Sequence, residues 1–185
     1  MPPKEKISKV RVTDTAFAMT REYGFKEVTA RKLAEKLGCS TQPIFRVYEN
    51  MDELREELFY QSAAFFGEYI LSKKSKTRPL YITMALAYID LAQSEKNLFE
   101  LIASVDDFGT ETIRQILQKD EWAAKIASLP GTEGLSEADL RDFFMMYWMF
   151  VHGLASLLVG KRVVLTDKEI KTLLEKAYMG FLSQF

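Results

Sequence analysis

The chain has 185 residues, of which 48% are hydrophobic and 28% are charged, and its formal net charge is −1. This balance is typical of a folded globular protein and excludes an intrinsically disordered chain. One cysteine excludes an intrachain disulfide, and one histidine excludes a metal site built from several imidazoles. Thinly spread proline and glycine, with no strict alternation of polar and apolar residues, predict an all-α fold.

Positive charge is concentrated in the first part of the chain. Residues 1–49 contain ten Lys and Arg against six Asp and Glu, whereas residues 50–185 contain fifteen against twenty. A basic N-terminal part on an acidic remainder indicates that the N-terminal part meets phosphate. The first residues lack the apolar core of a secretion signal, so we expect a cytoplasmic protein.

The first predicted helix covers residues 6–23, where apolar side chains recur with helical spacing, and it ends at Gly24. Phe25 is expected to fold back over its last turn. The expected buried face of this helix consists of Val12, Ala16, Met19 and Tyr23.

Residues 30–48, with the sequence ARKLAEKLGCSTQPIFRVY, have the pattern of a helix–turn–helix. Its first helix is expected to begin after the N-cap Thr29. That helix is expected to end at Gly38, because a sharp turn that needs positive φ favours glycine.

The second helix of the pair is expected over residues 41–47, with Ser40 or Thr41 as its N-cap. Its apolar side chains would pack against the first helix, and its polar side chains would face outward. A short helix with a packed back and a polar front fits the DNA major groove.

The remainder of the chain is also predicted to be helical, over residues 51–71, 80–93, 97–104, 110–128, 136–159 and 167–182. Asn50 followed by Glu53 resembles a capping box for the first of these helices, and Thr166 or Asp167 would cap the last. The basic segment 72–79 is interpreted as a solvated loop rather than as a second DNA contact.

An almost uninterrupted apolar run covers residues 143–159. A membrane span is the alternative interpretation, but the run contains His152 and is shorter than the roughly 20 residues that cross a bilayer. A helix that contacts both its own core and a partner subunit is also apolar all round. We therefore expect no membrane contact and a homodimer, in which the last two helices of each subunit form a four-helix bundle.

A set of positions within residues 12–58 forms a familiar pattern, consisting of Thr29, Leu33, Ala34, Gly38, Cys39, Ser40, Ile44, Phe45, Tyr48 and Leu54. This pattern closely resembles the DNA-binding head of the TetR family of bacterial transcriptional regulators. Trp148, His152 and Gly153 resemble a late-helix signature of that family. The resemblance implies a helix–turn–helix DNA-binding domain over residues 1–50 and a helical effector-binding and dimerisation domain over residues 51–185.

The resemblance also implies roles for individual residues. Thr29 would bind a phosphate, while Gln42 would pair with adenine and Pro43 would contact a thymine methyl group. Arg46 would reach a guanine edge or a phosphate, or pair within the protein. The expected DNA-binding residues are Thr29, Ser40, Thr41, Gln42, Pro43, Phe45, Arg46 and Tyr48.

Three positions depart from the usual pattern of the family. Phe45 lacks the hydroxyl of the common Tyr, Val47 stands where His is frequent, and Met51 replaces a common Lys. Two phosphate contacts are thereby lost, for which Tyr48 is an expected substitute, together with a basic arm formed by Lys4, Lys6 and Lys9. These departures leave open an alternative function, a helical protein-interaction module of the same fold with weakened or lost DNA binding.

The predicted effector-binding and dimerisation domain is rich in aromatic and methionine side chains, which can repack around an apolar ligand. The expected ligand-binding residues are Tyr88, Trp122, Tyr147, Trp148 and His152. No Ser–His–acid spacing, glycine-rich phosphate loop or dense carboxylate pair indicates catalysis, so we expect no enzyme and no cofactor. The sequence thus predicts a homodimeric repressor that binds a palindromic operator in double-stranded DNA and responds to a hydrophobic or amphipathic small molecule.

Overall fold

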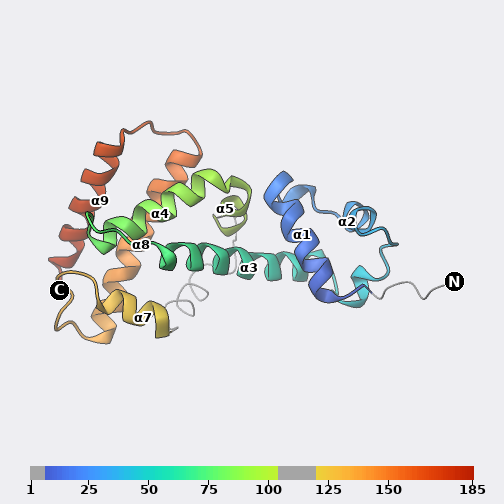
Figure 1. Cartoon of the computed structure of the whole chain (residues 1–185), viewed down its shortest axis with the longest axis horizontal. Helices are drawn as coiled ribbons and strands as arrows, with labels where there is room; N and C mark the ends of the chain where they lie inside the picture. The colour runs from blue at the N-terminus through green and yellow to red at the C-terminus, as the bar shows by residue number, and fades with distance from the viewer. Residues whose placement is uncertain (1–6, 104–119) are drawn as a thin grey trace. The chain divides into compact units, whose positions relative to one another are not determined.

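The computed structural model describes residues 7–103 and 120–185, and every regular element within these ranges is a helix (Figure 1). The all-α prediction is therefore confirmed. The described residues divide into two compact units, one of residues 7–67 and 95–103 and the other of residues 68–94 and 120–185. The boundary expected after residue 50 does not coincide with this division, because the first unit also includes a later segment of the chain.

The first unit opens with α1 (Lys9–Tyr23), the 3-10 turn η1 (Phe25–Glu27) and α2 (Ala30–Leu37). The Ser8 side chain caps α1, so this helix begins later than predicted. Gly24 ends α1 with φ +85°, as its glycine signal predicted. Tyr23 was expected on the buried face, but it lies in the last turn of the helix and is 54% exposed.

The signals that bound α2 are both confirmed. The Thr29 hydroxyl accepts a hydrogen bond from the Lys32 backbone N–H at 3.3 Å, which satisfies one of the free donors at the helix start. Gly38 adopts the left-handed conformation, with φ 69° and ψ 33°, and turns the chain out of the helix.

The third helix predicted over residues 41–47 is wrong as an α-helix, since its regular part is the 3-10 turn η2 (Ile44–Arg46). Gln42 precedes a proline, which disfavours helical dihedral angles at Gln42 and prevents the helix from starting earlier. Pro43 itself occupies the cap position, and η2 has no side-chain cap. The expected capping by Ser40 or Thr41 is therefore also wrong.

The core of the first unit joins α1, α2 and η2 to α3 (Met51–Ser72) and α5 (Lys96–Ala103). Asn50 caps α3, accepting from the Asp52 and Glu53 backbone N–H groups at 2.9 Å each. Fully buried aliphatic side chains fill this core, including Val12, Leu33, Ile44, Leu54 and Leu58. Leu101 of α5 belongs to the same cluster, which explains why α5 is part of the first unit.

The second unit contains α4 (Leu80–Ser94), α7 (Asp120–Ala127), α8 (Glu137–Val159) and α9 (Asp167–Leu182). Here α4 packs against both α8 and α9 (Figure 1). The Tyr81 and Tyr178 rings stack with centroids 3.7 Å apart, and Thr166 forms the predicted capping box at the start of α9. Of the helix predicted over residues 110–128, only α7 lies within the described residues.

Within the described residues, α8 alone is long and apolar enough to cross a membrane. In the structure this helix packs against α4, α7 and α9, and it buries Phe143, Tyr147, Val151, Leu154 and Ala155. Only 39% of its most apolar 18-residue stretch is buried, since side chains such as Met149 and Leu157 are exposed. The helix is therefore a core helix that also carries exposed apolar side chains, as far as the described residues show.

Candidate DNA-binding surface and ligand cavity

The outer side of the helix–turn–helix carries most of the side chains predicted to bind DNA. Thr29, Ser40, Thr41, Gln42, Phe45 and Arg46 are exposed, and Pro43 is half-buried. Between them, Ile44 is completely buried in the core of the first unit. Ile44 thus anchors the turn, while its sequence neighbours project from the surface of the first unit.

Tyr48 differs from the other predicted DNA contacts, because it is only 2% exposed. Its hydroxyl is hydrogen-bonded to that of Thr13 on α1, and burial raises the pKa of the Tyr48 phenol. This placement contradicts the expected phosphate contact through Tyr48. The aromatic ring fills the core of the first unit instead. The sequence did not indicate this role, because a hydroxyl group is also typical of an exposed side chain.

The cations of the first unit differ in whether acidic side chains neutralise them. Lys9 pairs with Glu57 at 2.8 Å on α3, and Lys32 pairs with Glu27. Lys9 therefore does not act as part of a free basic arm, while Lys4 and Lys6 lie outside the described residues. Arg46 has no ion pair within the part of the chain that the structure describes, so its charge remains available to an external anion.

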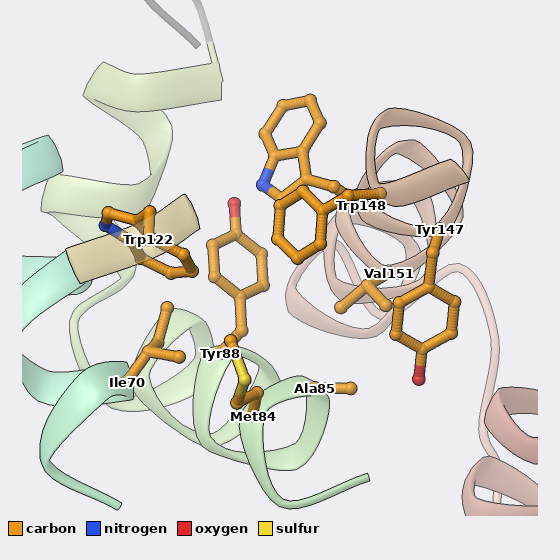
Figure 2. A pocket seen from close by; sticks show the side chains of 9 residues that line it. Ile70, Met84, Ala85, Tyr88, Trp122, Tyr147, Trp148 and Val151 are labelled. Carbon is orange, nitrogen blue, oxygen red and sulfur yellow. The ribbon is translucent and has the colours of Figure 1, made fainter. Parts of the chain in front are cut away.

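A cavity of about 40 Å³ lies in the second unit and has almost wholly carbon walls (Figure 2). Tyr88, Trp122, Tyr147 and Trp148, four of the expected ligand-binding residues, line it, and ligand binding by them stays a prediction. Sequence reasoning missed the remaining wall, which consists of Ile70, Met84, Ala85, Phe144 and Val151. The spacing of the wall residues on α8, at positions 144, 147, 148 and 151, is the helical signal that identifies one face.

His152 does not line this cavity but supports two residues that do. Its Nδ1 lies 2.6 Å from the Tyr88 hydroxyl oxygen, and its ring stacks on Trp148 with centroids 5.0 Å apart. Burial lowers the pKa of His152 and raises that of Tyr88, so both groups are uncharged at neutral pH. Two of the expected ligand-binding residues are thus hydrogen-bonded to each other, and His152 is not among the residues that line the cavity.

The hydroxyl of Tyr147 is buried and has no hydrogen-bond partner among the described residues. Figure 2 shows this hydroxyl pointing away from Tyr88 and from both tryptophans. The Tyr147 ring instead makes edge contacts with Tyr81 and Tyr178. Tyr147 therefore contributes its ring to the cavity wall rather than a polar handle.

The arrangement of these elements is shared with solved structures that cover nearly the whole chain. A putative TetR family transcriptional regulator from Vibrio parahaemolyticus is 20% identical, with a TM-score of 0.65 over 92% of this chain and 96% of its own. A TetR-family transcriptional regulator from Haemophilus influenzae RD is 17% identical, with a TM-score of 0.64 over 92% and 96%. The chain has the TetR-family fold.

A TetR-like transcriptional regulator from Rhodococcus sp. RHA1 has the same fold at 13% identity, with a TM-score of 0.59 over 94% of each chain. No protein-family model matches the sequence, and no curated protein matches it. The resemblance predicted from the helix–turn–helix is therefore confirmed at the level of the TetR-family fold. Within that fold, the exposed turn belongs to the first unit and the cavity to the second.

Proposed function

We propose that the chain is a cytoplasmic DNA-binding transcriptional regulator, a homodimeric repressor that binds a palindromic operator and responds to an apolar small molecule. The observation that carries this proposal is the exposed turn at residues 41–46. Gln42 and Arg46 are exposed there on either side of the buried anchor Ile44. Side chains with amide and guanidinium donors, held by a packed turn, are suited to reading base edges.

Dimerisation is supported by apolar side chains on the last two helices that are exposed in the part of the chain that the structure describes. Met149 and Leu157 on α8 are 53% and 40% exposed, and Leu173 and Met179 on α9 are 38% and 61% exposed. Covering these side chains with a second copy removes apolar area from water, which stabilises association. A twofold pair of heads then reads two half-sites about one DNA turn apart.

The effector role is supported by the cavity beside α4, whose walls are rings and aliphatic carbon. A ligand that binds one conformation of the second unit better than another shifts the population toward that conformation. Altered spacing of the two heads in the dimer would then change operator affinity.

A gel-shift titration with the DNA that flanks the gene tests the proposal. We expect sequence-selective binding that weakens steeply with salt, because phosphate contacts release counterions. Gln42→Ala should reduce the preference for operator over unrelated DNA, with a loss of about 1–3 kcal/mol. Gln93→Ala, which removes another exposed glutamine, in the second unit, is the matched control and should bind as the native protein does.

The alternative function, a protein-interaction module, makes the opposite prediction in the same assay. A head that no longer binds DNA should show no affinity for bulk DNA even at low salt, where non-specific binding is strongest. The short η2 turn and the exposed phenyl ring of Phe45 are the features that favour this alternative. Absence of low-salt binding would reject the regulator and support the interaction module.

A further inference from the structure

The cavity of the second unit is uncharged as well as apolar. None of its nine lining residues is Asp, Glu, Lys or Arg. The hydroxyl of the lining residue Tyr88 is hydrogen-bonded to His152 Nδ1 at 2.6 Å. The pair satisfies itself inside the protein and presents ring carbon to the cavity.

We propose that the effector is an uncharged, apolar aromatic molecule of the alkylbenzene class, bound against the rings of Tyr88, Trp122 and Trp148. Figure 2 shows the Tyr88 ring between the two indoles, so a flat ligand meets aromatic faces on more than one side. Two aromatic rings attract each other in offset or edge-on arrangements, in addition to the apolar area that they bury. This proposal deepens the effector part of the proposed function and rests on it.

The same walls discriminate against charged molecules. A carboxylate or ammonium group that enters the cavity loses its hydration, and no charged side chain in the wall compensates for that loss. Aromatic faces attract cations, so an aromatic ammonium compound is the rival ligand. The uncharged Tyr88–His152 pair supplies no carboxylate to assist a cation, and therefore the apolar ligand is favoured.

The volume of the cavity adds a second constraint. At about 40 Å³ it is smaller than a cavity of roughly 150 Å³, which accepts benzene. Binding therefore requires a wall to move, and Met84 is the adaptable part because its side chain is unbranched and flexible. Truncating Met84 should open the same space in advance and remove part of the cost of binding.

The chain contains an internal reporter for this experiment. It has two tryptophans, Trp122 and Trp148, and both line the cavity. Intrinsic tryptophan emission is therefore read while the native protein is titrated, without DNA, with four probes of similar shape. The probes are p-xylene, p-cresol, p-toluate and 4-methylbenzylammonium, which are respectively apolar, polar but neutral, anionic and cationic.

We expect p-xylene to change the emission and raise the melting temperature, with p-cresol weaker and the two ions without effect. Met84→Ala should bind p-xylene about tenfold more tightly than the native protein. Met19→Ala is the matched control, since Met19 is also buried but lies in the head core, and its p-xylene affinity should be unchanged.

Tyr88→Phe tests the polar pair directly. The substitution removes the phenol oxygen bonded to His152 and keeps the ring in the cavity wall, so p-xylene should still bind in preference to p-cresol.

Several results would overturn the inference: tighter binding of the ammonium probe, a response to p-toluate equal to that of p-xylene, or no response of the native protein to p-xylene. A gel shift on the same samples without any probe reports DNA binding separately. Loss of probe binding with DNA binding intact therefore rejects the ligand class and leaves the regulator standing.

Discussion

Arg21 on α1 and Glu95, the residue between α4 and α5, form a two-point ion pair within the first unit. Arg21 Nε donates to one carboxylate oxygen of Glu95 at 2.8 Å, and Arg21 Nη2 contacts the other oxygen. The Asn97 side chain adds a hydrogen bond of 3.0 Å to the Arg21 backbone carbonyl. The start of α5 is thereby fastened to the C-terminal end of α1, and Glu95 directly follows the helix that carries Met84 and Tyr88.

Under the proposed function, Glu95→Ala should uncouple ligand binding from DNA binding. The substitution removes the charge-assisted contacts at the point where α4 continues into the first unit, so a change in α4 is transmitted less well. We expect the operator affinity of the variant without ligand to stay close to native. Ligand should change the operator affinity of the native protein by about fivefold or more, and that of the variant hardly at all. Operator titrations with and without p-xylene measure this ratio.

Glu100→Ala is the matched control for that experiment, because Glu100 is an exposed acid on α5 that forms no ion pair within the described residues. It should retain the native response to ligand. An unchanged response in Glu95→Ala would show that the ion pair has only a structural role.

Phe45→Tyr should strengthen binding to all DNA sequences alike. Phe45 is 47% exposed on the turn, and the substitution adds a hydroxyl at a position where the TetR-family resemblance implies a phosphate contact. One added hydrogen bond contributes about 0.5–1.5 kcal/mol, or roughly a twofold to tenfold gain. Affinities for operator and for scrambled DNA, measured at the same salt concentration, test this expectation. A gain limited to the operator would instead indicate that residue 45 contacts bases.

Tyr48→Phe should lower stability and leave DNA affinity unchanged. The substitution removes the hydrogen bond between Tyr48 and Thr13 but retains the buried ring, and the Thr13 hydroxyl keeps its 2.9 Å bond to the Lys9 carbonyl. The free energy of unfolding should fall by about 1 kcal/mol. Urea unfolding and gel shifts on the same preparation separate the two effects. Reduced DNA affinity with unchanged stability would restore the phosphate contact that the burial of Tyr48 contradicts.

Local signals in the sequence were sufficient for several helix ends and for part of the cavity, but not for the 3-10 turn at residues 44–46. Thr29, Gly38 and Thr166 lie at chain positions where only a few residue types satisfy the free backbone groups or the dihedral angles. The roles of Tyr48 and His152 depend on partners 35 and 64 residues away, Thr13 and Tyr88, which no local pattern specifies. A polar atom in the sequence indicates that a partner is needed, and only the packed structure identifies that partner.

Acidification below about pH 6.5 should destabilise the protein through His152. Burial lowers the pKa of His152 in the folded chain, so the unfolded chain binds a proton more readily as the pH falls. The stability contributed by the neutral imidazole is therefore fully present above the unfolded pKa and is lost as the pH falls toward the folded pKa. His152 is the chain's one histidine, so no other imidazole titrates in this window.

The measurement is the midpoint of urea unfolding at a series of pH values between the histidine and carboxylate ranges. In His152→Gln, the side-chain amide can still hydrogen-bond the Tyr88 hydroxyl but cannot titrate, so the midpoint should become nearly independent of pH above the carboxylate range. Tyr60→Phe, a substitution at an exposed tyrosine of the first unit, should keep the native slope. An identical slope in His152→Gln would assign the acid sensitivity to other groups and refute the buried neutral imidazole.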